Sequence, residues 1–136
     1  MTRRTVVWIE VLGLACGLAM AAAPALAQDD LCGRPREAPE AMFQRLTKTE
    51  KLAESFRDKA YVTINDASNG TIWTFTVAGH PAHPSAICRE PVEEGGKLRI
   101  DMSIQCEASE AQCEELAQGF EVLNRKMLKE LEKQKK

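Results

Sequence analysis

The feature that most constrains the fold is a set of four cysteines after the first 30 residues, namely Cys32, Cys88, Cys106 and Cys113. An even number of cysteines in a short chain from an oxidising compartment is typical of a disulfide framework, and four cysteines allow three pairings. Buried free thiols are the alternative. A zinc site is less favoured, because no C-x-x-C spacing occurs and both histidines lie elsewhere. The sequence therefore predicts a small domain held by two disulfides.

Residues 1–27 have the order of a secretory signal peptide, which would account for an oxidising environment. Basic residues at Arg3 and Arg4 precede a mostly apolar run over residues 6–23, and an A-x-A cleavage site follows at residues 25–27. Cleavage there would leave a periplasmic or secreted protein without a membrane span.

Two other fates of this leader remain open. An uncleaved apolar run could stay in the membrane as an anchor, although Glu10 interrupts it and a stable span needs roughly 20 apolar residues. A lipoprotein could be cut before Cys16, although Gly13 stands where a lipobox usually has leucine. Cleavage after Ala27 is the preferred interpretation.

Removing 27 residues from the 136 leaves 109, enough for one domain with a modest core. We expect an irregular lead-in over residues 28–38 and a single domain over residues 39–136. After removal of the leader, 16 Lys and Arg stand against 19 Asp and Glu, a net charge of −3. A nucleic-acid-binding surface usually shows clustered basic residues on a basic domain, so nucleic-acid partners are not expected.

Changes of hydrophobic period divide the domain into helices and strands. Apolar residues three and four positions apart predict a helix over residues 39–59, with Pro39 at its first position and a possible break near Thr47. A second helix is predicted over residues 110–133, where Ser109 is placed to cap the first turn. Alternation and turn signals predict four strands between them, at about residues 60–65, 71–77, 86–92 and 98–105.

These strands form two hairpins. Centring the first turn on Asn69 and Gly70 pairs Ile64 with Phe75, both on one face. The second hairpin turns at residues 95–96.

The order of elements predicts an α+β fold, a four-stranded antiparallel meander with the N-terminal helix and the long C-terminal helix packed on one face. Trp73 is expected in the core on the covered face. The opposite face, which carries Tyr61, Thr63, Thr74 and Thr76, is expected to be open to solvent.

The second hairpin limits the disulfide pairing, because it sets Cys88 opposite Ser103 or its neighbour, beyond disulfide reach of Cys106. A bridge from Cys106 to Cys113 would lock the start of the C-terminal helix. The preferred set is therefore Cys106–Cys113 with Cys32–Cys88.

His80 and His83 are the only histidines, and they share a loop that Pro81 and Pro84 stiffen. We interpret this loop as a structural turn or a binding surface, which makes these four residues candidate binding residues. As an alternative, the two imidazoles could hold Zn²⁺ or Cu²⁺, but two ligands are an incomplete site and the sequence places no third nearby.

No residue pattern predicts catalysis. Ser85 and Ser103 lack the glycines of a nucleophile elbow. The acidic pairs at residues 93–94 and 114–115 fit a solvated turn and a helix start better than two carboxylates held in a cleft. The prediction is a protein that is not an enzyme and needs no cofactor.

A pattern in the second half of the domain reads W-x-F-T, then G-H-P-A-H-P, then C-R. Its residues are 73–76, 79–84, Cys88 and Arg89, followed by Cys106 and Cys113. Over roughly residues 60–130, the chain resembles an uncharacterised family of small exported proteins of Gram-negative bacteria. The resemblance implies a periplasmic location and points to the loop around His80 and His83 as the part to test.

Together, these features predict an exported, disulfide-stabilised binding or structural protein of the periplasm. Its expected partner is a protein or an envelope component. The alternative is a periplasmic metal-binding protein that uses His80 and His83.

Overall fold

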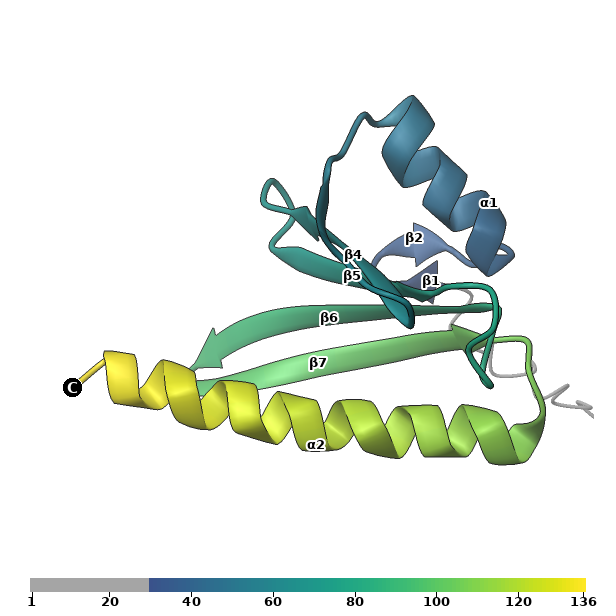
Figure 1. The fold of residues 1–136 in the computed structure, drawn as a ribbon. Helices are drawn as coiled ribbons and strands as arrows, with labels where there is room; N and C mark the ends of the chain where they lie inside the picture. Colours follow the sequence, from purple (N-terminus) through teal and green to yellow (C-terminus); the bar gives the residue numbers. More distant parts are fainter. Residues whose placement is uncertain (1–29) are drawn as a thin grey trace, which may run out of the picture.

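The computed structural model describes residues 30–136, so the predicted signal peptide and its alternatives lie outside the described residues. The elements are β1 (Asp30–Leu31), β2 (Arg34–Pro35), α1 (Pro39–Gln44) with a π-helical turn (Arg45–Thr49), β3 (Glu54–Arg57), β4 (Tyr61–Asp66), β5 (Thr71–Thr76), β6 (Ser85–Glu94), β7 (Lys97–Cys106) and α2 (Glu110–Gln134). Strands β3 to β7 form an antiparallel meander in sequence order, and β1 pairs with β2 separately (Figure 1). The α+β class is confirmed.

The meander has five strands where four were predicted, because β3 lies inside the segment predicted as the end of the first helix. The helical backbone instead ends with the π-helical turn, and Lys51 has a positive φ of 60°. β3 is an edge strand that pairs only with β4, and all four of its residues are exposed. A strand without a buried face needs no period-two pattern, so its sequence carries no strand signal.

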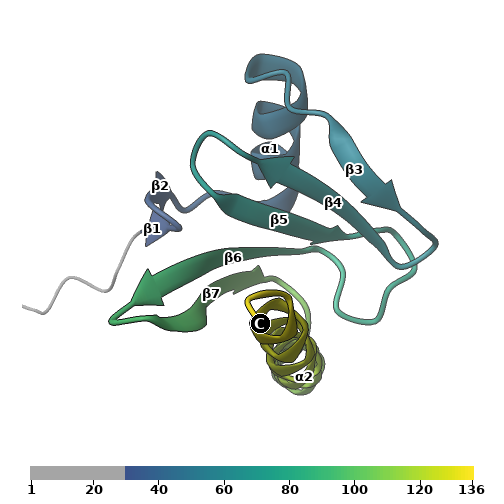
Figure 2. The ribbon, with the colours of Figure 1, turned by 90° about the vertical axis from the view of Figure 1, so that its left-hand side faces the viewer.

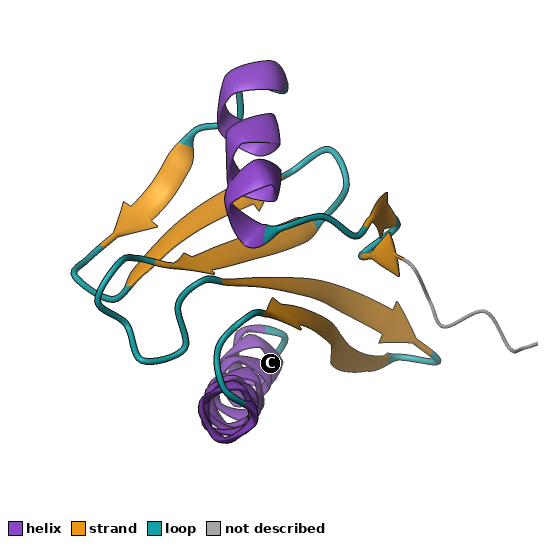
Figure 3. Cartoon of the chain, turned by 90° about the vertical axis from the view of Figure 1, so that its right-hand side faces the viewer, coloured by secondary structure: helices purple, strands orange, loops and turns teal. Residues whose placement is uncertain are grey.

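The helices cover opposite faces of the sheet, so the prediction that both pack on one face was wrong (Figures 2 and 3). The core on the α1 side consists of Leu31, Met42, Leu46, Val62, Ile64, Trp73, Phe75, Ala86 and Cys88. The core on the α2 side consists of Ala82, Ile87, Leu116 and Phe120. Trp73 is fully buried, as predicted.

The register between the two hairpins explains this arrangement. β5 and β6 pair Trp73 with Cys88 and Thr74 with Ile87. β7 pairs Ile104 with Ile87, so its apolar stripe continues the threonine face of the first hairpin and not the Trp73 face. α2 packs on that stripe and covers the face predicted to be open, which leaves Thr74 buried.

The first hairpin differs from the prediction by two residues. Ile64 lies opposite Trp73 and not opposite Phe75, because four residues separate Asp66 from β5. The Asp66 carboxylate accepts hydrogen bonds from the side chains of Ser68 and Asn69, at 2.6 and 2.7 Å, and so supports the longer turn. A shift of two residues keeps the same face, so Ile64 still lies in the core.

The second hairpin and both disulfides are as predicted. Cys88 lies opposite Ser103 across a two-residue turn. Disulfides join Cys32 to Cys88 and Cys106 to Cys113, with Cα–Cα distances of 6.3 and 5.8 Å. The first bridge ties the β1–β2 lead-in, predicted to be irregular, to the centre of the sheet. The second ties the end of β7 to the first turn of α2.

The predicted C-terminal helix is also confirmed. The Ser109 side chain accepts a hydrogen bond from the backbone N–H of Gln112, with Glu110 in the first turn and Lys133 in the last. Among residues 30–136, no helix has the length and apolar character needed to cross a membrane. α2 instead lies along the sheet and forms one wall of a pocket.

Candidate functional site

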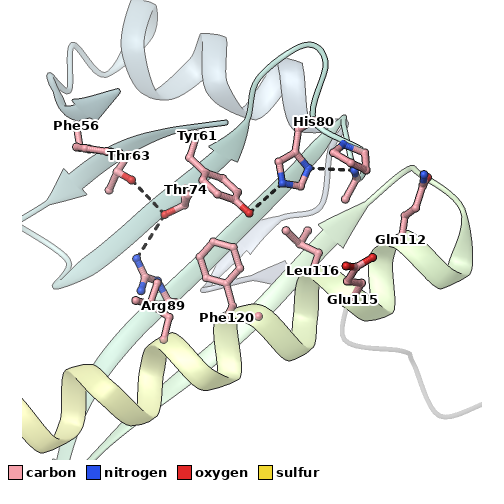
Figure 4. Close-up of a pocket in the computed structure, with 14 residues that line it drawn as sticks. Phe56, Tyr61, Thr63, Thr74, His80, Arg89, Gln112, Glu115, Leu116 and Phe120 are labelled. Carbon is pink, nitrogen blue, oxygen red and sulfur yellow. Dashed lines mark hydrogen bonds between the residues drawn. The ribbon is translucent and has the colours of Figure 1, made fainter. Parts of the chain in front are cut away.

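A pocket of about 600 Å³ lies between α2 and the threonine face of the sheet (Figure 4). This volume is within the range of small-molecule sites, roughly 300–1,000 Å³. Strands β3 to β6, the loop after β5 and α2 all contribute to it. The lining residues are Phe56, Tyr61, Thr63, Thr74, His80, Pro81, Ala82, Arg89, Gln112, Glu115, Leu116, Gly119, Phe120 and Leu123.

The pocket holds a buried arginine without a counterion. Arg89 of β6 is only 5 % exposed. Its Nη2 donates a long hydrogen bond of 3.4 Å to Thr74 Oγ1, whereas Nε and Nη1 are buried without a hydrogen-bond partner. Among the residues that the structure describes, no carboxylate forms an ion pair with Arg89. The guanidinium carbon lies 5.3 Å from the centroid of the Phe120 ring.

This burial has an electrostatic cost. Desolvation lowers the pKa of Arg89 below its ordinary value, and an arginine side chain nevertheless remains a cation at neutral pH. A buried charge that lacks a partner destabilises a folded protein, because the lost hydration is not replaced. The cation–π contact with Phe120 compensates only part of the hydration that Arg89 loses on burial. An anionic ligand in the pocket would supply the missing partner.

Tyr61 places a second hydrogen-bond donor in the same pocket. The backbone N–H of Ala82 donates to His80 Nδ1 at 3.0 Å, so this nitrogen carries no hydrogen. The proton of the neutral imidazole is therefore on Nε2, which donates to the Tyr61 hydroxyl oxygen at 2.9 Å. The Tyr61 O–H hydrogen is left to donate to another acceptor. Burial, with a smaller contribution from the Asp58 charge, raises the pKa of Tyr61, so the phenol keeps its proton.

The remaining lining is largely apolar. Leu116 and Phe120 are buried on α2, and the Tyr61 ring meets the Phe120 ring edge-on with centroids 5.7 Å apart. Phe56 of β3 and Leu123 of α2 line the pocket while remaining 54 % and 43 % exposed. Large apolar side chains left in water beside a pocket are typical of a binding surface. The pocket thus combines polar donors with an apolar wall and an apolar rim.

The structure divides the four predicted loop residues between two cavities. His80 and Pro81 line the pocket under α2, whereas His83 and Pro84 line a smaller cavity of about 240 Å³ on the α1 side. His83 Nδ1 lies 3.0 Å from the backbone oxygen of Thr76 and donates a hydrogen bond to it. The two histidines therefore face different cavities and do not form one site.

The geometry gives little support to metal binding by this loop. Both ring nitrogens of His80 already have hydrogen-bond partners. Within residues 30–136, no group of three His, Cys, Asp or Glu side chains could hold a metal ion. All four described cysteines are in disulfides.

Sequence reasoning missed Arg89 and the pocket around it. A signal was present, because Arg89 follows Ile87 by two residues and so occupies the same face of a buried strand. A cation two residues from a buried isoleucine on the same face of a strand indicates either a buried ion pair or a ligand site. Phe120 has the apolar helical spacing of a core residue, and such spacing does not distinguish a core residue from the wall of a pocket.

Comparisons with known proteins give no match to this chain from any family model, any curated protein or any solved structure.

Proposed function

We propose that this protein is an exported, disulfide-stabilised binding protein, and that its ligand site is the pocket between α2 and the sheet. The observation that carries the proposal is Arg89, a buried cation with two unpartnered nitrogens on the wall of that pocket. Protein folds rarely bury an arginine without a counterion unless the site has another use. Both disulfides fit an oxidising compartment, in keeping with the predicted signal peptide and the family resemblance.

The shape of the pocket favours a small amphipathic ligand as the envelope component that the protein binds. A concave pocket of about 600 Å³ encloses a small molecule, whereas protein partners usually meet flatter and larger surfaces. Leu116 and Phe120 offer apolar contact, and Arg89 and Tyr61 offer hydrogen bonds. This combination of an apolar body with a few polar groups is typical of small-molecule sites.

Gly119 provides a way to fill the pocket without disturbing the helix. It lies in α2 among the lining residues, and a Cβ atom at this position would meet no atom within 4 Å. A leucine there would project its side chain into open space. It would also replace a poor helix former by a good one, a gain of up to about 1 kcal/mol.

The test is a fluorescence titration with N-phenyl-1-naphthylamine, a neutral apolar probe. We expect saturable binding to the oxidised protein, and an affinity at least about tenfold lower in Gly119→Leu, because the leucine occupies the volume that the probe needs. Gln118→Leu is the matched control, since Gln118 is an exposed neighbour outside the pocket. Equal binding by all three proteins would reject the pocket as the site.

A further inference from the structure

We infer that the ligand of this pocket is a monocarboxylate with an apolar body, such as a medium-chain fatty acid, and that Arg89 and Tyr61 bind its carboxylate. This inference rests on the proposed function, because it takes the pocket under α2 to be the binding site.

The charge of the pocket favours a singly charged anion. Arg89 is the buried cation of the lining, and the other charged lining residue, Glu115, is an exposed acid on α2. One carboxylate would neutralise the guanidinium. A phosphate dianion would bring a second negative charge into the same dry region and toward Glu115, at an electrostatic cost. A cationic or neutral headgroup would leave Arg89 unpaired.

The hydrogen-bonding groups also match a carboxylate. A guanidinium has one N–H at Nε and two at Nη1, and both of these nitrogens of Arg89 lack an acceptor. Nε–H and the Nη1 hydrogens lie on different edges of the guanidinium, so one carboxylate oxygen would accept from Nε–H and the second is left for a donor from another side. Tyr61 supplies the further donor, because His80 Nε2 holds the hydroxyl oxygen and leaves its hydrogen to point elsewhere.

Arg89 and Tyr61 are held around the same ring. The Arg89 guanidinium carbon and the Tyr61 ring centroid lie 5.3 and 5.7 Å from the Phe120 centroid. Figure 4 shows the Arg89 guanidinium, joined to Thr74, and the Tyr61 hydroxyl, joined to His80, on either side of the Phe120 ring. A carboxylate bound there would place an attached chain beside Phe120. The exposed apolar rim at Phe56 and Leu123 provides further surface for such a chain.

The test is displacement of N-phenyl-1-naphthylamine by four ligands with the same ten-carbon chain: decanoate, decan-1-ol, decylamine and decyl phosphate, all below their aggregation concentrations. In the wild-type protein, we expect decanoate to displace the probe at a concentration at least about tenfold lower than any of the others. Hydrogen bonds to a charged group have this magnitude.

The matched variants are Arg89→Met and Tyr61→Phe. Arg89→Met removes the charge but keeps an unbranched apolar side chain, so decanoate is expected to lose its advantage over decan-1-ol. Tyr61→Phe keeps the ring that meets Phe120 and removes one donor. We expect it to weaken decanoate by about threefold to tenfold, more than it weakens decan-1-ol, because a hydrogen bond to a charged group is the stronger one.

The outcomes separate this inference from the proposed function. The carboxylate inference would be overturned if decanoate and decan-1-ol displaced the probe equally well. It would also be overturned if decanoate kept its advantage over decan-1-ol in Arg89→Met. In both cases the proposed function would stand, provided that Gly119→Leu still blocks binding of the probe. Stronger displacement by decyl phosphate or decylamine would overturn it too. If Gly119→Leu leaves probe binding unchanged, the proposed function fails, and this inference with it.

Discussion

The guanidinium carbon of Arg89 lies 5.3 Å from the centroid of the Phe120 ring, and this cation–π contact compensates only part of the cost of burying the charge. The strand that carries Arg89 and the helix that carries Phe120 are linked by β7, which pairs with β6 and packs against α2. A cation–π contact away from water stabilises a protein by about 2 kcal/mol, which is less than the free energy lost when a guanidinium leaves water. The burial of Arg89 therefore costs stability in the ligand-free protein.

Replacing Arg89 by methionine should stabilise the ligand-free protein. We expect Arg89→Met to raise the free energy of unfolding by about 1 kcal/mol, since methionine fills similar space without an unpaired buried charge. Urea denaturation of the oxidised protein measures this. Arg125→Met is the control, because Arg125 is exposed and forms no ion pair within residues 30–136, so its replacement should change the free energy by less than about 0.5 kcal/mol. A loss of more than about 2 kcal/mol in Arg89→Met would show that Arg89 is structural.

Asp66 should stabilise the protein in a pH-dependent way. Its carboxylate is 2 % exposed, and burial alone would raise its pKa. Hydrogen bonds from Ser68, Asn69 and Arg34 outweigh burial, so the pKa of Asp66 lies below its ordinary value. Because the folded pKa is the lower one, the stabilisation is fully present above the unfolded value near pH 4 and is lost as the pH falls through the folded pKa.

Asp66→Asn tests this directly. We expect a loss of about 2 kcal/mol in the free energy of unfolding at pH 7, because an acceptor of several hydrogen bonds becomes partly a donor. The difference from the wild type should shrink when denaturation is repeated below pH 4. Glu121→Gln is the control, because Glu121 is exposed and its replacement removes a negative charge without removing buried hydrogen bonds. A difference that does not depend on pH would mean that the charge of Asp66 contributes nothing.

The two disulfides should contribute unequally to the free energy of unfolding. The Cys32–Cys88 bridge spans 56 residues and the Cys106–Cys113 bridge spans 7. The chain-entropy relation gives about 4 kcal/mol for the longer loop and about 2.5 kcal/mol for the shorter one. Paired alanine substitutions and urea denaturation measure each contribution. A larger loss from the short bridge would contradict this order, and a tryptic peptide linking Cys88 to Cys106 would contradict the pairing.

Metal ions should not bind at the histidine loop. His80 has hydrogen bonds at both ring nitrogens, and His83 faces the cavity on the other side of the sheet. Calorimetric titration with Zn²⁺ and Cu²⁺ should therefore give the same heats for the wild type and for a His80→Ala/His83→Ala double variant. Saturable heat that the double variant abolishes would restore the metal-binding alternative.

Export should leave a chain that begins at Gln28. Intact-mass analysis of the protein recovered from a Gram-negative host should give the mass of residues 28–136 less four hydrogens, one pair for each disulfide. Retention of residues 1–27 would instead indicate a membrane anchor, and a lipid-modified chain beginning at Cys16 would indicate a lipoprotein.

Local signals in the sequence were sufficient for most of the fold. The turn at Gly95–Gly96 set Cys88 opposite Ser103 or its neighbour and so disfavoured a bridge from Cys88 to Cys106. The positions of Cys106 and Cys113 around the helix start then favoured the pairing that the structure has. Ser109 marked the start of α2. β3 was missed because an exposed edge strand needs no alternating pattern, and the Leu52 and Phe56 spacing imitates a helix.

The site was harder to predict, because it depends on how the two hairpins join. Thr74 and Ile87 share a face only through the register of β5 with β6, which a loop of eight residues between the strands does not reveal. Without that register, Arg89 had no assigned neighbours and the threonine face had no covering helix. Tyr61 and His80, 19 residues apart, meet because the register of β4 with β5 sets Tyr61 opposite Thr76, near the start of the loop that carries His80.

The measurement that most directly tests the central claim is the ¹H–¹⁵N resonance of Arg89 Nε–H, recorded by NMR with decanoate and with decan-1-ol. The resonance is identified by its loss in Arg89→Met. A carboxylate that accepts this hydrogen bond should shift the resonance strongly downfield, whereas the alcohol should leave it nearly unchanged. An unchanged Arg89 Nε–H resonance while decanoate perturbs the backbone amides of Leu116 and Phe120 would contradict the claim that Arg89 binds the ligand's charge.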